Sequence, residues 1–349
     1  MFAAVILIGA ALLMLPISAQ ERTVTPFHEA LFTATSAVCV TGLVVRDTAS
    51  HWSAFGQAVL MVLIQIGGLG VITVGASFSL LSGRRISLSQ RGRMQEAMSA
   101  PKVGGIVRLT GFVIRASLMI EGIGALCMLP VFCRDFGVSG IWKAVFHSVS
   151  AFCNAGFDLM GTPDTPFVSL TAYRADPVIN LTISALIVVG GIGFLTWDDV
   201  RTNRLCFHRY RLQSKVILAA TALLILLPML YFFCFEFKGG ALRERLLLSL
   251  FQSVTPRTAG FNTADYTSLS SSGRGLTILL MFIGGSSGST AGGIKTTTAA
   301  VLVANAFAVF RRQKSPEMFG RRMEEKAVHD AAAIFTLYLV LSLTGAFVI

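Results

Sequence analysis

Charged side chains are scarce in this sequence. Asp, Glu, Lys and Arg make up 13% of the 349 residues, whereas soluble proteins of this size carry about 25%. Hydrophobic residues reach 54% and the mean hydropathy is +0.70. This composition excludes a soluble globular protein and predicts an all-α membrane protein that crosses the bilayer many times.

Paired cysteines and nucleotide-binding motifs are also lacking. None of the six Cys residues belongs to a C-x-x-C motif, which argues against a cysteine-based zinc site or a thioredoxin-like redox site. No Walker or glycine-rich dinucleotide motif occurs, so any nucleotide sensing has to come from a partner. We therefore expect no resident cofactor in this chain.

Basic residues are unevenly distributed. Lys and Arg outnumber Asp and Glu by 29 to 18, and 17 of the 29 fall in the stretches 84–108, 201–215 and 311–326. Such residues collect in the cytoplasmic loops of membrane proteins. We expect these stretches on the cytoplasmic side, and we expect membrane lipid rather than nucleic acid as a partner.

Long apolar runs predict the membrane spans. Complete spans are predicted over 2–18, 52–82, 105–133, 177–200 and 214–237, an interrupted span over 274–310, and another from Asp330 onward. Between them lie three short stretches, 27–38, 141–152 and 246–254, which cannot cross a bilayer. We expect each to be a re-entrant half-helix.

Each short stretch leads into a similar segment that contains a glycine. The segments are SAVCVTGL (36–43), SAFCNAGF (150–157) and VTPRTAGF (254–261), and their glycines lie 114 and 104 residues apart. The spans that follow the first two also match, with IGGLGVIT at 66–73 and VGGIGFLT at 189–196. The chain is therefore predicted to repeat a unit of helix, half-helix, glycine turn and helix.

Backbone carbonyls at such turns can replace the water around a dehydrated cation, and glycine permits the required backbone conformation. The C-termini of the half-helices would bring partial negative charge to the same place. Arg257, beside the third turn, is expected to hold it through hydrogen bonds. The predicted filter residues are Val40, Thr41, Gly42, Leu43, Asn154, Ala155, Gly156, Phe157, Thr258, Ala259, Gly260 and Phe261.

The interruption in the sixth span, 284–297, contains Ile294 as its only large apolar residue. Irregular backbone at membrane depth is tolerated where protein or a water-filled cavity surrounds it, so we expect a movable constriction beneath the filter. Lys295 would form an electrostatic barrier, pair with an acidic group or extend to the cytoplasmic interface. The predicted gate residues are Gly284, Gly285, Ser286, Ser287, Gly288, Ser289, Thr290, Ala291, Gly292, Gly293 and Lys295.

The three glycine segments resemble the filters of Trk/Ktr/HKT potassium transporters, and 284–297 resembles the gating loop of that family. The bacterial Ktr-type membrane subunit is the most similar. The resemblance implies four repeats around one pseudo-fourfold pore, a homodimer of pore subunits and a cytoplasmic ring of nucleotide-binding regulatory subunits.

On that pattern, the three repeats cover 1–83, 105–200 and 214–310, and the cytoplasmic loops cover 84–104, 201–213 and 311–329. Residues 330–349 begin a fourth repeat that is incomplete. We therefore expect a truncated chain that does not conduct alone.

The resemblance implies uptake of potassium across the plasma membrane, with sodium able to pass or to modulate transport, and potassium as the only metal bound. A gradient-coupled cation symporter is an alternative, because broken spans with central glycines are typical of symporters too. A structural membrane scaffold is a second alternative. Residues 284–288 also fit the G-x-S-x-G motif of serine hydrolases, but that motif belongs to a strand–turn–helix in a soluble sheet. We expect no enzymatic activity.

Overall fold

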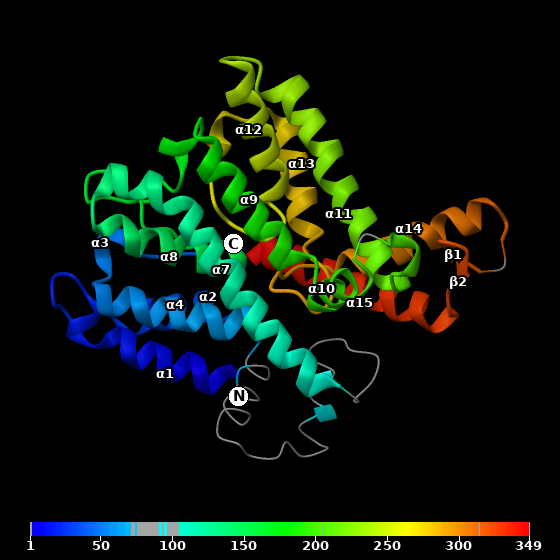
Figure 1. Ribbon diagram of the computed structural model, residues 1–349, viewed down its shortest axis with the longest axis horizontal. Coiled ribbons are helices and arrows are strands. Elements are labelled where there is room, and N and C mark those ends of the chain that lie inside the picture. Colours follow the sequence, from blue (N-terminus) through cyan, green and yellow to red (C-terminus); the bar gives the residue numbers. More distant parts are fainter. Residues whose placement is uncertain are drawn as a thin grey trace.

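The computed structural model describes residues 2–348 apart from 71–73, 75–90, 93, 96–104, 205 and 314. This part of the chain is mostly helical with few strands (Figure 1), which confirms the predicted all-α class. The helices are α1 (Phe2–Met14), α2 (Phe27–Val38), α3 (Thr48–His51), α4 (Ala54–Leu69), α7 (Ile106–Phe136), α8 (Ser139–Phe152), α9 (Pro177–Gly191), α10 (Phe194–Asn203), α11 (Leu212–Tyr231), α12 (Leu242–Val254), α13 (Ser271–Phe282), α14 (Thr296–Phe310) and α15 (Glu325–Val348).

Short elements complete the fold. A π-helical turn at Phe232–Glu236 extends α11, and 3-10 turns lie at Pro16–Ser18, Thr171–Tyr173, Phe207–Arg209 and Tyr266–Ser268. The strands β1 (Glu317–Met318) and β2 (Arg321–Arg322) form an antiparallel hairpin between α14 and α15. In Figure 1 this hairpin lies at the end of the molecule away from α1 and α2.

Among the described residues, three helices are long and apolar enough to cross a bilayer: α7, α11 with its π-helical extension, and α15. The pair α9 and α10 would make a fourth, but the two helices are bent by 96°. The predicted span over 177–200 therefore contains a sharp bend between α9 and α10 and is not one continuous helix. Gly193 lies in the bend with φ of 89°, a conformation that a residue with a Cβ adopts only at a cost.

The second predicted span, 52–82, also differs from the structure. Helix α4 begins at Ala54, where Ser53 caps it through a bond from the Gly56 N–H, and ends at Leu69. Gly70 follows with φ of 84°. Most of the predicted span beyond Gly70, and most of the predicted loop 84–104, lies outside the described residues.

The other two predicted loops contain regular structure. The segment 201–213 holds the end of α10, a 3-10 turn and the start of α11. Its conformation is fixed by Asp199, which accepts hydrogen bonds from the Arg211 N–H and the Ser214 hydroxyl. The segment 311–329 holds the hairpin and the first turn of α15, which begins at Glu325 rather than near Asp330.

The three short helices α2, α8 and α12 lie where the sequence places half-helices. Their last residues, Val38, Phe152 and Val254, are those expected, and α8 and α12 begin a few residues earlier than expected. Helix α8 is central to the core, because every residue from Phe146 to Phe152 is buried. It packs against α4, α7 and α9.

The contact between α7 and α8 depends on Gly140. A Cβ at this position would lie 2.3 Å from the Phe132 carbonyl oxygen of α7, so only glycine allows this approach. We predict that G140A lowers the free energy of unfolding by about 1–3 kcal/mol, as overpacking of a tight contact does. Thermal unfolding of the purified protein in detergent measures this change.

Gly122 provides the matched control for this prediction. It lies on α7 with no atom near its Cβ position, so G122A should be neutral or stabilising by up to about 1 kcal/mol through helix propensity. Equal unfolding midpoints for the two variants would contradict the prediction.

Candidate functional site

The three glycine turns meet in the folded chain. A Cβ on Gly42 would lie 2.6 Å from the Ala155 carbonyl oxygen, and one on Gly156 would lie 2.6 Å from the Ala259 carbonyl oxygen. A Cβ on Gly260 would lie 3.2 Å from the Cα of Gly156. The first turn thus contacts the second, and the second contacts the third, backbone against backbone.

The backbone of each turn has the same conformation. The glycines Gly42, Gly156 and Gly260 have φ of 77°, 70° and 85°, and the residues two positions earlier also have positive φ, namely Val40 (56°), Asn154 (56°) and Thr258 (71°). The residue between these two positions in each turn (Thr41, Ala155 or Ala259) does not have positive φ. This alternation of handedness sets the three turns apart from a uniform strand and is common to all of them.

Positive φ at Val40 and Thr258 is costly, because both residues are β-branched. Such strain amounts to about 1–3 kcal/mol per residue and persists only where the surroundings fix the conformation. A glycine in the sequence already suggests a residue with positive φ, and asparagine tolerates positive φ better than most residues do. Nothing in the sequence indicates the conformation of Val40 or Thr258.

A backbone hydrogen bond ties each turn to the end of its half-helix, five residues back in the first two turns and four residues back in the third. The middle residues Thr41, Ala155 and Ala259 donate their N–H to the carbonyls of Ser36 (2.9 Å), Ser150 (2.8 Å) and Thr255 (3.0 Å). Helix α12 ends two residues earlier relative to its glycine than α2 and α8 do. Pro256 explains this difference, because proline has no N–H to donate and disfavours helix at the preceding residue.

The residues that follow the glycines differ from one another. The carbonyls of Phe157 and Phe261 accept hydrogen bonds from the hydroxyls of Ser150 (2.7 Å) and Thr255 (2.5 Å), and both rings are fully buried. Leu43, the corresponding residue in the first turn, is 62% exposed. The carbonyls of Phe157 and Phe261 are therefore already paired with protein donors.

The irregular segment between α13 and α14, here called the inner loop (residues 283–295), lies against the second and third turns. The Thr290 hydroxyl donates to the Phe152 carbonyl (2.9 Å) and accepts from the Asn154 side-chain amide (2.8 Å). The Gly292 N–H donates to the Thr258 hydroxyl (3.2 Å). The loop thus contacts both turns through residues that the sequence already singled out.

The inner loop also fills the bend between α9 and α10. Ser286 N–H donates to the Gly191 carbonyl (2.9 Å), Thr290 N–H to the Gly190 carbonyl (3.2 Å), and Phe194 N–H to the Gly288 carbonyl (2.8 Å). A broken helix leaves such groups without intrahelical partners. The loop supplies those partners, so a segment of the third repeat stabilises the break in the second.

Further contacts lie within the loop or join it to the adjoining ends of α13 and α14. Its two ends run side by side, with hydrogen bonds from Gly284 N–H to the Ile294 carbonyl (3.0 Å) and from Ile294 N–H to the Phe282 carbonyl (3.3 Å). The Lys295 ammonium donates to the Ala291 carbonyl (2.7 Å), so its partner is a backbone oxygen and not an acidic group. Ser286 is fully buried, with its hydroxyl 3.1 Å from that of Thr296.

A cavity of about 340 Å³ separates the first turn from the inner loop. Its lining includes Cys39 and Val40 of the first turn, Gly67 and Gly70 at the end of α4, and residues 288–292 of the loop. Because a water molecule takes up about 30 Å³ in the liquid, the cavity has room for several. It lies between the first turn and the loop.

Asp158 lies two residues beyond Gly156, in the segment that leads from the second turn toward α9. Burial is the main cause that raises the pKa of its carboxyl to about 6, with the nearby charge of Asp47 acting in the same direction. At neutral pH the carboxylate still predominates, so it brings negative charge close to the turns.

Three further charged residues are described here, of which Arg257 differs from expectation. Arg257 was expected to hold the third turn, yet its guanidinium makes no hydrogen bond to any residue that the structure describes. Glu121, buried on α7, accepts two hydrogen bonds from the Gln65 amide (2.9 and 3.2 Å). Arg115, also on α7, is exposed.

Comparisons with known proteins show the family of this chain. The family model TrkH, described as cation transport protein, matches residues 2–349. The chain is 42% identical to the potassium/sodium uptake protein NtpJ of Enterococcus hirae, over 100% of this chain and 77% of that protein. It is 41% identical to the Ktr system potassium uptake protein B of Bacillus subtilis, over 98% of this chain and 76% of that protein.

A solved structure is similar in fold. The crystal structure of the potassium transporter TrkH from Vibrio parahaemolyticus superposes with a TM-score of 0.74 and 18% identity, over 98% of this chain and 70% of that one. At 18% identity this likeness shows a shared fold alone. The family model and the two relatives match this chain in sequence. This chain belongs to the TrkH family of cation transport proteins.

Proposed function

We propose that this protein takes up potassium, with sodium able to pass or to modulate transport, through a filter built by the three glycine turns. The observation that carries the proposal is the backbone contact between these turns, which have the same alternating φ. Carbonyls grouped in this way can replace the hydration shell of an alkali cation. Relatives named for potassium or potassium/sodium uptake support the same ion.

The proposed ligands are the carbonyls of Val40, Thr41 and Gly42 and of their counterparts 154–156 and 258–260. Leu43, Phe157 and Phe261 complete the filter segments, the two Phe residues as anchors whose carbonyls are bonded to hydroxyls. The second turn is buried, whereas Thr41 and Gly260 are exposed. A fourth turn on this exposed side would complete a pseudo-fourfold pore of repeats that begin with 1–83, 105–200 and 214–310.

The inner loop is the proposed gate, with residues 284–293 and Lys295 as its working parts. Its contacts to Thr258 and Asn154, together with the cavity behind it, support a position directly below the filter. In this proposal these bonds hold the loop in a closed position, and opening would require them to break.

The assembly is proposed by family resemblance. We infer a homodimer in the plasma membrane, with the basic stretches 84–104, 201–213 and 311–329 on the cytoplasmic side and a ring of nucleotide-binding regulatory subunits docked there. The relatives named as parts of Ktr systems support a multi-component assembly. The transported ion is the proposed metal, and no resident cofactor or nucleic acid is part of the proposal.

A gradient-coupled symporter is the second candidate. The 96° break between α9 and α10 favours it, because discontinuous helices near a central site are typical of coupled transporters. Potassium flux that continues without a sodium or proton gradient supports the channel-like filter, and flux that stops without one supports the symporter.

We predict that G156A reduces rubidium-86 uptake at least about tenfold in cells that lack other potassium uptake. A Cβ at this position would meet the Ala259 carbonyl, and φ of 70° adds strain of about 1–2 kcal/mol. G111A on α7, where the Cβ position is open, is the matched control and should transport normally. Normal uptake by G156A at equal expression would contradict the filter.

Cys39 tests the cavity below the filter. It is an exposed free thiol at the end of α2 and lines the 340 Å³ cavity. We predict that a small methanethiosulfonate reagent applied from the cytoplasmic side blocks rubidium uptake, and that C39S abolishes this sensitivity. C127S, which removes an exposed thiol on α7, should leave the block intact. Block that persists in C39S would place the ion path elsewhere.

Thr290 tests the gate. T290V removes the hydroxyl shared by the Phe152 carbonyl and the Asn154 amide, which leaves buried polar groups unpaired at a cost of about 1–3 kcal/mol. We predict a several-fold rise in ion flux through the loosened loop, measured in proteoliposomes. T290S keeps the hydroxyl and is expected to behave as the unaltered protein. Equal ion flux in T290V and T290S would contradict the prediction, because the gate would then not depend on this hydroxyl.

A further inference from the structure

Arg257 is a buried cation without a partner among the residues that the structure describes. The residue is 7% exposed, and its Nε is fully enclosed with no hydrogen-bond acceptor. Within the described residues, no carboxylate forms an ion pair with it. Buried donors in folded proteins are almost always paired with protein or with ordered water. We therefore expect this guanidinium to have a hydrogen-bond acceptor.

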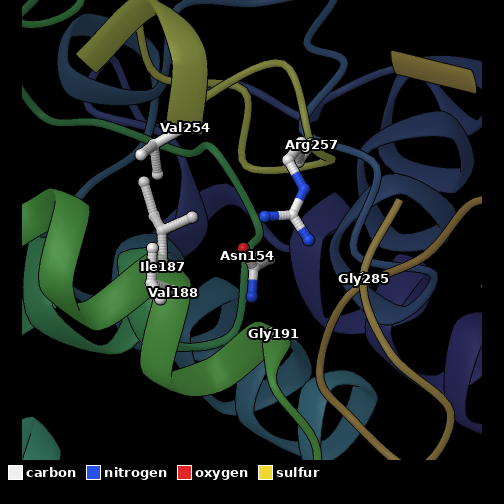
Figure 2. Close-up of a pocket in the computed structure, with 7 residues that line it drawn as sticks. All are labelled: Asn154, Ile187, Val188, Gly191, Val254, Arg257 and Gly285. Atoms are coloured by element: carbon white, nitrogen blue, oxygen red, sulfur yellow. The ribbon is translucent and has the colours of Figure 1, made fainter. Parts of the chain in front are cut away.

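A buried acceptor without a partner lies opposite. Asn154 is 1% exposed, and its Oδ1 is enclosed with no donor. Its Nδ2 donates to the Thr290 hydroxyl at 2.8 Å, and this bond fixes which end of the amide faces the inner loop. Figure 2 shows the guanidinium of Arg257 directed toward the amide of Asn154.

A small cavity lies between the two groups. It is lined by Asn154, Ile187, Val188, Gly191, Val254, Arg257 and Gly285. About 10 Å³ is open to the centre of a water-sized sphere, which is close to the minimum that a single water molecule requires. Its wall combines one donor group and one free acceptor with aliphatic side chains from α9 and α12.

We propose that this cavity is a binding site for one water molecule, which accepts a hydrogen bond from Arg257 and donates one to Asn154 Oδ1. The size of the cavity and the pairing of an unused donor with an unused acceptor both fit a neutral ligand with both capacities. A halide anion fits poorly, because the lone pairs of Asn154 Oδ1 would face it. The C-termini of α8 and α12, with their partial negative charge, offset the charge of Arg257.

The water completes a chain of polar contacts. It joins Arg257 of the third turn to Asn154 of the second, and Asn154 is bonded through Thr290 to the inner loop and to the Phe152 carbonyl. The water is thus a structural part that links two turns and the loop. Its presence does not depend on the transported ion, so its test is separate from that of the proposed function.

Two neighbouring valines on α9 provide a test, because a water-filled cavity and a dry cavity predict opposite shifts of the thermal unfolding midpoint. Val188 lines the cavity and Val189 does not, and both are half-buried. V188I adds a methylene that displaces the water and leaves both polar groups unpaired, so its thermal unfolding midpoint should lie about 2 °C or more below that of V189I. A dry cavity would instead be filled favourably. A midpoint for V188I equal to or above that of V189I overturns the proposal.

A density map of the unaltered full chain in lipid nanodiscs, at a resolution that shows ordered water, gives a second readout. We expect one light peak within hydrogen-bonding distance of both Arg257 and Asn154 Oδ1. Crystals of the protein grown in bromide test the anion, since bromide scatters anomalously. An anomalous peak in the cavity, or no peak of any kind, overturns the water site whether or not the protein transports potassium.

Discussion

The structure depends on three stretches of backbone that pack against one another without side chains between them. Gly42, Gly156 and Gly260 are required there because a Cβ on the first two would overlap a carbonyl oxygen of the next turn. The strained φ of Val40, Asn154 and Thr258 persists only because each turn is bonded to its half-helix and pressed against a neighbour. The half-helices, the core around α8 and the inner loop all serve to hold this contact in place.

The inner loop and the α9–α10 bend depend on each other. Backbone groups at the bend have no helical partners, and the loop pairs only part of its own N–H groups, such as those of Gly284 and Gly285, within itself. Bonds from Ser286 and Thr290 to Gly191 and Gly190, and from Phe194 to Gly288, satisfy both. Any movement of the loop must therefore expose or re-pair the polar groups of α9 and α10, which couples the proposed gate to the basic segment that follows α10.

Much of this was accessible from sequence because it is local. The half-helices end at Val38, Phe152 and Val254 as expected, since an amphipathic stretch followed by a glycine turn, or by Pro256, marks a helix end. The bend inside the predicted span 177–200 was not predicted, because the hydropathy of the run is the same whether the helix bends at Gly193 or continues. The hydrogen bonds that stabilise the bend come from residues about 100 positions away and leave no local signal.

The sequence by itself determined the membrane setting, the half-helices, the three glycine positions and the irregular segment that interrupts the sixth span, because composition, periodicity and glycine are properties of neighbouring residues. Only the tertiary structure decided that the turns touch in the order first, second, third, and that Arg257 faces Asn154 across a cavity instead of bonding to its own turn. These are relations between distant segments, and they follow from how the half-helices pack.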